Sequence, residues 1–535
     1  MKKYGNTVIL LLLLVCFSAD LSAKVESLDV TGNAKLFWNR LNNGFDKTTT
    51  HELSTGARLY DDLDEFAYTM FSLKFNLLVM RNVTLALGLN KKDTLWASHN
   101  DYFNSEHNAN LGEFIGDPSP SSQRNYKGIK IENLYIKADE IIWRYVNFTG
   151  GRQFYSGTVY EETDAIKDIP QDLFLYITGD GLVFNLSWDF LFFEPQMKSD
   201  FFAFKINDGT AGLYDSSGGF IWDRMYGDND INLYGFINRI TYKNNSFKSY
   251  LMFYDKGGKK LVQGDSNADG FDHRYLIGLN YTRQGVFTKY LKVFVEGGYE
   301  LGRKAVGTYY DLDIGLDLVQ KDYYGTARYN AYVYRAGLEY RQEKLAAALF
   351  HLGGSGDKPS TPGTIEGFYG LNEVMYGRTY GTDFAGYGEI FKASPYMHNS
   401  GLGSPVQEED QRLQDPSVSR YPTGIIGANI SYTIGTTGDD ENKVVPMLEY
   451  FYYYNLPGNS VVAVNRFGGK YKAIGLGMEV DASVRYVYQN KLVLKFLYGL
   501  YLPGQAYRSG YDNIIQGETG KDPAELFKFQ TELYF

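Results

Sequence analysis

The chain has 535 residues, with 58 glycines, 47 tyrosines and 35 phenylalanines but only 14 prolines and one cysteine. Its formal net charge is −10. Nucleic acid is therefore not an expected partner, because phosphate contacts need a basic surface. Beyond the N-terminal segment no apolar run approaches the ~18 residues of a membrane-spanning helix, which excludes a helical membrane protein.

Residues 1–23 predict a secretory signal that is cleaved from the mature chain. Two lysines precede the apolar run 8–17, and Ala23 offers a small residue at the expected cut. Cys16, the one cysteine of the chain, lies inside this run, where we interpret it as filler of the signal core. The mature chain 24–535 is then free of cysteine and needs no disulfide framework outside the cytoplasm.

From Ser27 onward the chain alternates apolar and polar residues in runs that are typical of β-strands. The runs are 27–39, 66–80, 83–90, 127–139, 145–154, 180–189, 197–208, 231–243, 247–255, 272–284, 289–303, 329–342, 344–352, 424–434, 444–455, 471–489, 491–502 and 525–535. The connections after odd-numbered runs are long and those after even-numbered runs are short, as at Arg81-Asn82 and Asn244-Asn245. This rhythm predicts an all-β fold, a transmembrane antiparallel up-and-down barrel of about 18 strands, with sixteen as the alternative count.

The run 471–489 indicates what surrounds these strands. Ile474, Leu476, Met478, Val480, Ala482 and Val484 would share one face, and Gly475, Gly477, Glu479, Asp481, Ser483 and Arg485 the other. Lipid outside and water inside explain this split, whereas a soluble sandwich rarely needs strands of this length. Two groups of tyrosines fit aromatic girdles at opposite interfaces, namely Tyr450, Tyr452 and Tyr454 at the loop end and Tyr486 and Tyr488 at the turn end. We therefore expect periplasmic short turns and extracellular long loops.

The last run supports the same location. Phe527, Phe529, Thr531, Leu533 and Phe535 are expected to point outward, with Lys528, Gln530, Glu532 and Tyr534 between them. A terminal strand that ends on an aromatic residue behind a signal segment is typical of outer-membrane barrels of Gram-negative bacteria. We expect outer-membrane lipid as its surroundings and the barrel-assembly machinery as a partner that recognises this strand through Phe535.

Four short motifs carry a resemblance to a known family. They are Gly151-Arg152-Gln153, Asp180-Gly181-Leu182, Glu479-Val480-Asp481 and Pro503-Gly504. Together they resemble the alginate-export family of outer-membrane barrels, and the resemblance implies a barrel of eighteen strands that passes polysaccharides or other hydrophilic solutes. It also implies that Arg152 faces the pore, although strict alternation would turn Arg152 outward unless a bulge follows Gly150-Gly151.

The polar faces of the predicted strands give a set of candidate pore-lining residues. They are Lys74, Lys130, Arg152, Arg239, Arg274, Lys292, Arg335, Glu339, Arg341, Glu479, Asp481 and Arg485. A lumen that guides an anionic polymer would carry one dominant sign, whereas this set is mixed. Either the charges form a transverse field that selects polar solutes, or they neutralise one another and keep the lumen wet.

Two connections between the predicted strands deserve separate interpretation. Connection 353–421 is the longest, so it could fold inward as a constriction, cover the mouth as a lid, or stay on the surface. Asp265, Asn267 and Asp269 with Gly270 resemble the start of a calcium loop, but Leu276 stands where the bidentate Glu should be. A calcium site and a tight Asx turn are the two alternatives, and we expect no other cofactor.

The sequence lacks the usual catalytic signatures, with no GxSxG, HExxH or GxxxxGK[ST] motif, so we do not expect an enzyme. Three hypotheses about function follow. The chain could be a passive channel for hydrophilic solutes such as saccharides, a dedicated exporter of an alginate-like exopolysaccharide, or a surface receptor or adhesin displayed on a barrel. A transporter with an N-terminal plug is disfavoured because the first predicted strand begins within a few residues of Lys24.

Overall fold

The structure, a computed structural model, describes most of the predicted strands and parts of their connections. It describes residues 26–42, 63–97, 130–141, 143–155, 177–191, 194–208, 230–257, 271–312, 318–356, 363–368, 387–390, 423–435, 442–457, 462–464, 470–472, 474–504 and 523–535. Among these residues there is no helix long and apolar enough to cross a bilayer. The predicted signal 1–23 and the predicted calcium loop lie outside the described residues.

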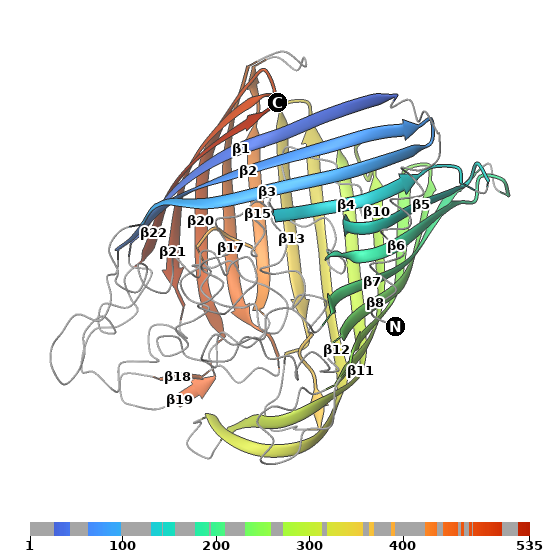
Figure 1. Ribbon diagram of the computed structural model, residues 1–535. Helices are drawn as coiled ribbons and strands as arrows, with labels where there is room; N and C mark the ends of the chain where they lie inside the picture. Colours follow the sequence, from blue (N-terminus) through green and yellow to red (C-terminus); the bar gives the residue numbers. More distant parts are fainter. Residues whose placement is uncertain are drawn as a thin grey trace, which may run out of the picture.

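Antiparallel strands make up the whole wall of the molecule (Figure 1). The wall strands are β1 Ser27–Asn42, β2 Leu63–Met80, β3 Val83–Ala97, β4 Lys130–Ala138, β5 Val146–Tyr155, β6 Ile177–Ser187, β7 Gln196–Asp208, β8 Asp230–Tyr242, β9 Asn245–Lys256, β10 Asp272–Gln284, β11 Leu291–Leu312, β12 Leu318–Gln342, β13 Leu345–Gly354, β15 Thr423–Tyr432, β17 Lys443–Asn455, β20 Gly475–Tyr488, β21 Leu492–Pro503 and β22 Ala524–Tyr534. The short strands β14 Thr364–Ile365 and β16 Ile434–Gly435 join the same sheet, and β18 Val462–Val464 pairs with β19 Lys470–Lys472.

The wall closes where the first strand meets the last. Each of the eighteen wall strands pairs with the next wall strand along the chain, and β1 also pairs with β22 from Asn33–Tyr534 to Asn42–Glu525. Beyond these pairs, Gly32 and Phe535 exchange backbone hydrogen bonds of 2.9 and 3.1 Å. The predicted all-β fold is therefore confirmed as a closed antiparallel barrel, and its 20-stranded sheet has eighteen wall strands when β14 and β16 are left out.

Short turns gather at one end of the barrel, the upper end in Figure 1. Two residues separate β2 from β3 and β8 from β9, and two separate β12 from β13. Lys243 in the turn between β8 and β9, and Asn490 in the turn between β20 and β21, both have a φ of 52°, the left-handed conformation that tight hairpins require. The rhythm of short and long connections predicted from the sequence is thus present in the structure, with one exception.

The exception is the hairpin of β11 and β12. We predicted strands 289–303 and 329–342 with a long loop between them. Instead β11 has 22 residues and β12 has 25, and their pairing continues past Arg303 until Leu312 lies opposite Leu318. The intervening sequence holds no proline and contains β-favouring residues such as Val306 and Val319, so the ladder continues beyond the neighbouring strands and curls under the barrel (Figure 1).

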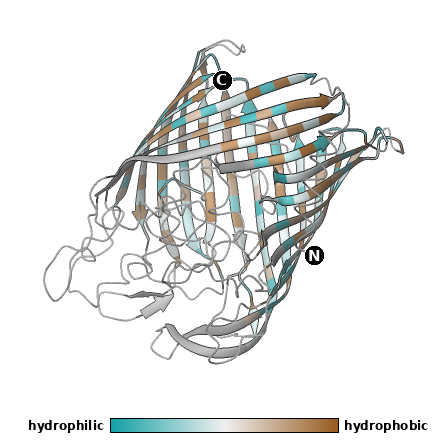
Figure 2. Cartoon of the chain, in the orientation of Figure 1, coloured by the Kyte–Doolittle hydropathy of each residue, from teal (hydrophilic) through white to brown (hydrophobic). Residues whose placement is uncertain are grey.

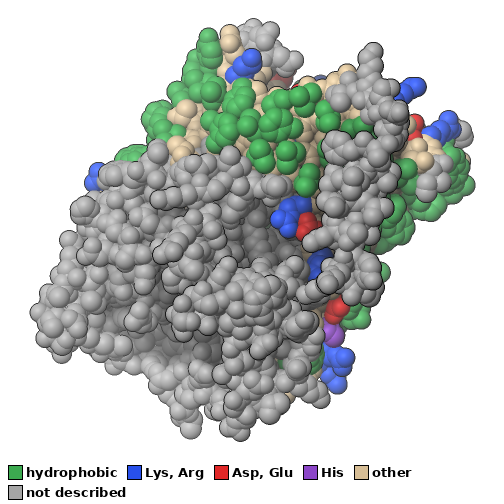
Figure 3. Space-filling view, viewed as in Figure 1, with side chains coloured by type: hydrophobic (Ala, Val, Ile, Leu, Met, Phe, Trp, Pro, Cys, Tyr) green, Lys and Arg blue, Asp and Glu red, His purple; other side chains and the backbone are tan. Residues whose placement is uncertain are grey.

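The two faces of the wall are reversed relative to those of a soluble protein. On β10, Arg274 is 1% exposed, whereas Tyr275, Ile277 and Leu279 are 49%, 47% and 51% exposed. Polar and apolar residues alternate along the strands in Figure 2, and apolar side chains cover the outer surface towards the turn end in Figure 3. On β10 the charged side chain thus faces the inside of the barrel and the large apolar ones its outside.

One residue departs from the predicted alternation. We expected Leu476 to share the outer apolar face with Met478, but Leu476 is 2% exposed and belongs to the interior apolar cluster. The reason is a break in the ladder of β17 and β20, where Tyr453 pairs with Gly477 but Tyr454 pairs with Gly475. This bulge turns Leu476 into the lumen, and Gly477 accommodates it with a φ of 149°.

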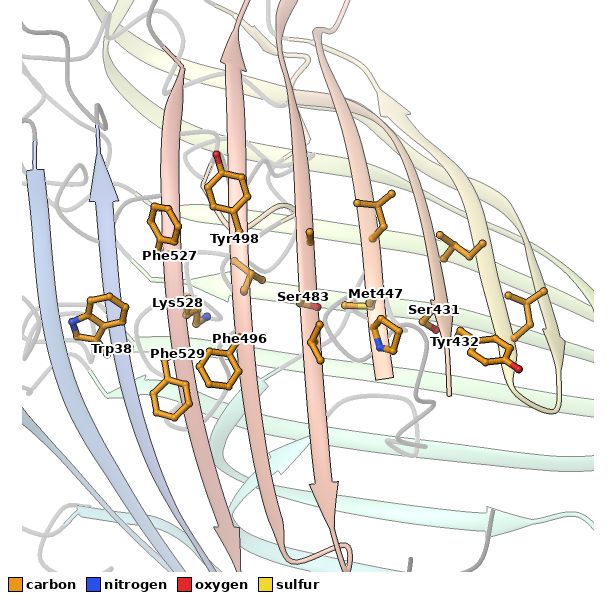
Figure 4. Close-up of a pocket in the computed structure, with 17 residues that line it drawn as sticks. Trp38, Ser431, Tyr432, Met447, Ser483, Phe496, Tyr498, Phe527, Lys528 and Phe529 are labelled. Atoms are coloured by element: carbon orange, nitrogen blue, oxygen red, sulfur yellow. The ribbon is translucent and has the colours of Figure 1, made fainter. Parts of the chain in front are cut away.

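An apolar groove of about 710 Å³ lies on the outer face (Figure 4). Ala482 is a small residue within it, and two aromatic pairs border it. The ring centroids of Phe496 and Phe529 lie 4.7 Å apart, and those of Tyr498 and Phe527 lie 5.0 Å apart. The groove belongs to the outer apolar surface, so it is separate from the charged interior.

Candidate functional site in the barrel lumen

Ion pairs cross the inner wall between neighbouring strands. Arg335 on β12 lies directly opposite Glu296 on β11, and its Nη2 is 2.8 Å from Glu296 Oε2. Lys292 lies opposite Glu339 in the same ladder, with Nζ 2.8 Å from Oε2. Arg341 Nη2 is 3.6 Å from the other oxygen of Glu339. The alternation of the two strands therefore brings predicted pore residues of opposite sign together.

Arg274 on β10 has a buried environment of its own. Its side chain lies 3.3 Å from Asp272 and 3.6 Å from Glu300, and its guanidinium carbon is 4.0 Å from the centre of the Tyr254 ring. A buried guanidinium requires such compensation by carboxylates and aromatic faces. We therefore assign Arg274 a mainly structural part in the wall.

A second network lies on β5 to β8. Arg239 Nη2 is 2.7 Å from Asp200 Oδ2. The Tyr155 hydroxyl donates to the same carboxylate at 2.6 Å, and Asn185 Nδ2 donates to its other oxygen at 2.7 Å. Asp200 is 3% exposed and was absent from the predicted set, and its neighbour Phe201 is 45% exposed on the outer face.

Three carboxylates form an acidic row on the opposite part of the wall. Glu449 on β17 lies directly opposite Asp481 on β20, and Glu479 precedes Asp481 on the same face. Their exposures are 6%, 1% and 0%. Carboxylates that lie next to one another away from water repel each other when all are ionised, unless hydrogen-bond donors offset that repulsion.

A short segment of connection 353–421 supplies such donors from inside the barrel. We name residues 387–390 the lumen strap. The backbone N–H groups of Glu389 and Ile390 donate to Glu479 Oε1 at 2.7 and 2.6 Å, and that of Glu389 also reaches Asp481 Oδ2 at 3.2 Å. The Tyr453 hydroxyl lies 2.9 Å from Glu479 Oε2 and 3.0 Å from the Tyr387 carbonyl oxygen, and its one proton is shared between these two acceptors. The strap is therefore bound to the acidic row through its backbone.

The side chains of the strap extend its contacts in both directions around the wall. Glu389 Oε1 is 3.4 Å from Lys495 on β21, and its Oε2 is 3.1 Å from Lys528 on β22. At the other end, Arg335 on β12 donates to the Tyr387 hydroxyl at 3.4 Å. Burial raises the pKa of this hydroxyl, so Tyr387 acts there as a neutral acceptor. The strap thus connects β12 with β22 across the interior.

The backbone of the strap depends on one glycine. Gly388 has a φ of 89°, a conformation that other residues rarely adopt. A Cβ at this position would also overlap the Tyr453 hydroxyl and the Glu479 carboxylate. Gly388 therefore permits the close approach on which the hydrogen bonds to Glu479 depend.

Most of the predicted pore residues lie on the inner face. They are Lys74, Arg239, Arg274, Lys292, Arg335, Glu339, Arg341, Glu479, Asp481 and Arg485. Lys74 lies opposite Thr31 and shares its face with Ser72, whose hydroxyl bonds to Asn33 at 2.5 Å. Lys130 pairs with Asn90 through its backbone, and its side chain lies outside the described residues.

The prediction for Arg152 is wrong. Arg152 and Asp180 form a two-pronged ion pair with both distances 2.9 Å, on side chains that are 50% and 58% exposed. They alternate with Gln153 and Val183, which are buried inside. The expected bulge is absent from the ladders of β5, which keep their register through Gly151. Strict alternation therefore places Arg152 on the outer face.

The predicted calcium site stays a prediction. Asp265, Asn267 and Asp269 lie outside the described residues. Within the described ranges there is no group of three or more His, Cys, Asp or Glu residues that could hold a metal ion.

Tyr387, Gly388 and Glu389 are further inner residues that the sequence analysis missed. Alternation assigns faces only to strands, and a loop segment has no such rule. The available signal was the length of connection 353–421, which left an inward fold, a lid and a surface position as alternatives and did not indicate which residues would enter.

Comparisons with known proteins add a resemblance of overall shape. No family model matches the sequence, the alginate-export family included, and no curated protein is detectably similar. Among solved structures, OccAB2 of Acinetobacter baumannii is 11% identical with a TM-score of 0.47, over 96% of this chain and 99% of that one. OprD of Pseudomonas aeruginosa is 9% identical with a TM-score of 0.42, over 96% and 97%.

Proposed function

We propose that the chain is an outer-membrane porin, which passes hydrophilic solutes, saccharides among them, by passive diffusion through a charged lumen. The observation that carries the proposal is the reversed wall, with Arg274 and Glu479 at 1% and 0% exposure inside and Ile277 and Phe496 at 47% and 58% outside. A closed barrel of this kind leaves no unpaired strand edge in lipid. The polar inner face needs water, so a membrane location explains both faces.

The orientation follows from the same membrane location. The short turns would face the periplasm and the long connections the outside, as in single-chain barrels of the Gram-negative outer membrane. Tyr450 in the loop-side half of β17 and Tyr488 at the turn end of β20 are 37% and 41% exposed on the outer face, which suits aromatic girdles at two interfaces. The predicted signal 1–23 is consistent with export to this membrane.

The inner charges favour a general channel for polar solutes. Basic and acidic groups alternate around the lumen, as in the pairs Arg335–Glu296 and Lys292–Glu339. Such pairs leave a wet wall without a dominant sign, which suits neutral polar solutes. The lumen strap would narrow the passage on one side and form its constriction. Neither task requires catalytic chemistry, so we propose no enzymatic activity.

The same inner residues give less support to the two alternative functions, an exporter and a surface receptor or adhesin. An exporter of an anionic polysaccharide would have to pass the acidic row of Glu449, Glu479 and Asp481, which repels polyanions. A receptor or adhesin would present connection 353–421 to the outside, whereas residues 387–390 bind the inner wall.

Planar bilayers test the proposal directly. Purified, folded protein is expected to give stepwise ion currents, and liposomes containing it are expected to swell in neutral mono- and disaccharides. Folded protein that gives neither current nor swelling would overturn the porin assignment. Selective block of the current by an alginate oligomer, with no block by a neutral oligosaccharide, would favour the exporter.

A further inference from the structure

Contacts of the lumen strap divide into two groups that differ in chemistry. On one side, backbone N–H groups of Glu389 and Ile390 bind the Glu479 carboxylate, at 2.7 and 2.6 Å. On the other side, the Glu389 carboxylate lies between two lysines of the wall, Lys495 and Lys528, at 3.4 and 3.1 Å. In both groups a charged group of the wall binds the strap.

The lysine side of this arrangement is nearly closed to solvent. The side chains of Lys495 and Lys528 are 13% and 12% exposed and that of Glu389 is 16% exposed. Charges this far from water attract one another through a lower effective dielectric, and salt screens them little. The two lysines also repel each other, so a carboxylate between them is the group that makes their proximity favourable.

Apolar packing fixes where the strap rests. Tyr387 and Ile390 are 3% and 5% exposed within the interior apolar cluster, and the Tyr387 ring lies 5.3 Å from that of Phe350. Gly388 between them makes the close approach to Tyr453 possible. The bound position is therefore specific, with a defined seat for each of the four residues.

We propose that the lumen strap is an electrostatic latch that closes part of the channel, with the Glu389 carboxylate as the group that holds it against β21 and β22. This inference rests on the proposed porin function and adds regulation of the same lumen. When Glu389 loses its charge, the strap leaves Lys495 and Lys528 and the passage widens.

The strap can leave the wall because the wall side chains that bind it are charged and can be hydrated. Glu479, Lys495 and Lys528 are ionisable side chains that a wet lumen can hydrate after the strap departs. Exchange of protein hydrogen-bond partners for water partners has a small net effect on free energy, because each lost contact is replaced. Bound and released positions of the strap can therefore be close in free energy, which is the condition for a two-state element.

The natural sequence allows a clean chemical test, since the chain holds no cysteine after Cys16 in the predicted signal. Glu389→Cys is introduced and single-channel conductance is recorded before and after two thiol reagents of similar size. One methanethiosulfonate reagent attaches a sulfonate and thereby restores a negative charge at position 389. The other attaches a quaternary ammonium group. The matched control is Glu532→Cys, because Glu532 pairs with Lys35 at 3.2 Å on the same wall and has no described contact with the strap.

A latch predicts that Glu389→Cys raises the conductance about twofold, that the sulfonate returns it to the native value, and that the ammonium reagent leaves it high. If both reagents lowered the conductance equally, the constriction would be purely steric and the latch would be overturned. Unchanged conductance in Glu389→Cys would overturn it as well. Neither result affects the porin assignment, which fails only if the unmodified protein gives no current.

A second variant separates the effect of the Glu389 charge from the effect of the bound backbone position of the strap. Gly388→Ala cannot accept the bound backbone because its Cβ would overlap Tyr453 and Glu479. The latch predicts high conductance in Gly388→Ala with Glu389 intact, and no return to the native value when sulfonate is attached in the double variant Gly388→Ala/Glu389→Cys. A return to the native value in that double variant would contradict the proposed seat of the strap.

Discussion

The backbone N–H of Ile390 lies 2.6 Å from Oε1 of Glu479, so a loop residue and a wall residue that are 89 positions apart share a hydrogen bond inside the barrel. Glu479 also accepts from Glu389 N–H and from the Tyr453 hydroxyl. One carboxylate thus organises three donors, and its loss would free the strap from the acidic row as well as remove a charge.

Glu479→Ala tests this part of the seat. Without the carboxylate, the Ile390 N–H loses its acceptor, while the Glu389 N–H keeps only the 3.2 Å contact with Asp481 and Tyr453 keeps only the Tyr387 carbonyl. A buried donor left without an acceptor costs about 1–3 kcal/mol. We expect the strap to leave β20 and the single-channel conductance to rise about twofold. The measurement is a planar-bilayer recording, with retention of heat-modifiable migration on gels as the check that the barrel has folded. A folded variant with native conductance would show that Glu479 does not hold the strap.

Lys292→Glu tests whether the charged side chains on the ladder of β11 and β12 line the path of the permeating ions. The substitution places a second carboxylate opposite Glu339 on a side chain that is 36% exposed, so the variant should fold. Cation permeability relative to chloride is expected to rise about twofold, which corresponds to roughly 0.5 kcal/mol of added charge interaction. Arg335→Glu, opposite Glu296, should shift selectivity in the same direction.

Arg152→Gln is the matched control for this experiment. It also removes a positive charge from a strand, but Arg152 lies on the outer face with Asp180. The reversal potential in a salt gradient should therefore stay at its native value in Arg152→Gln. If Lys292→Glu leaves the reversal potential unchanged while Arg152→Gln moves it, the two faces of the wall have been assigned the wrong way round.

Sequence patterns predicted the strands of the barrel wall far better than they predicted the loop segment that lies in the lumen. Periodicity of two fixes the face of each strand residue once the register is set, which is why Lys292 and Glu339 could be placed inside before their contact was known. The failures have local causes. A bulge beside Tyr454 reverses the face of Leu476, and extended pairing of β11 and β12 replaces a predicted loop.

Motif resemblance was the least reliable guide to the site. It assigned Arg152 to the pore, whereas the alternation of β5 alone assigned it outward, and the structure follows the alternation. The strap had no periodic signal at all, because its position depends on tertiary contacts with Glu479, Lys495 and Lys528 that short-range rules do not encode.

The seam between β1 and β22 predicts a sensitive C-terminus. Deletion of Phe535 removes the two backbone hydrogen bonds with Gly32 and the ring contact with Phe71 at 6.1 Å. We expect a loss of about 2 kcal/mol in barrel stability from the hydrogen bonds, seen as a lower midpoint in urea unfolding. Phe535→Leu keeps the backbone bonds and should lose less. Equal midpoints for the deletion and for Phe535→Leu would show that the seam bonds contribute nothing measurable.

The orientation of the barrel can be tested with single cysteines at its two ends. Phe287 lies in the short turn between β10 and β11 and is 96% exposed, whereas Pro457 is exposed at the opposite end, after β17. Short turns are expected in the periplasm, so a membrane-impermeant maleimide added to intact cells should label Pro457→Cys and leave Phe287→Cys unlabelled until the outer membrane is opened. Background labelling is low because the predicted mature chain has no cysteine. Labelling of Phe287→Cys in intact cells, with Pro457→Cys protected, would invert the barrel, and the connection that carries residues 387–390 would then enter the lumen from the periplasm.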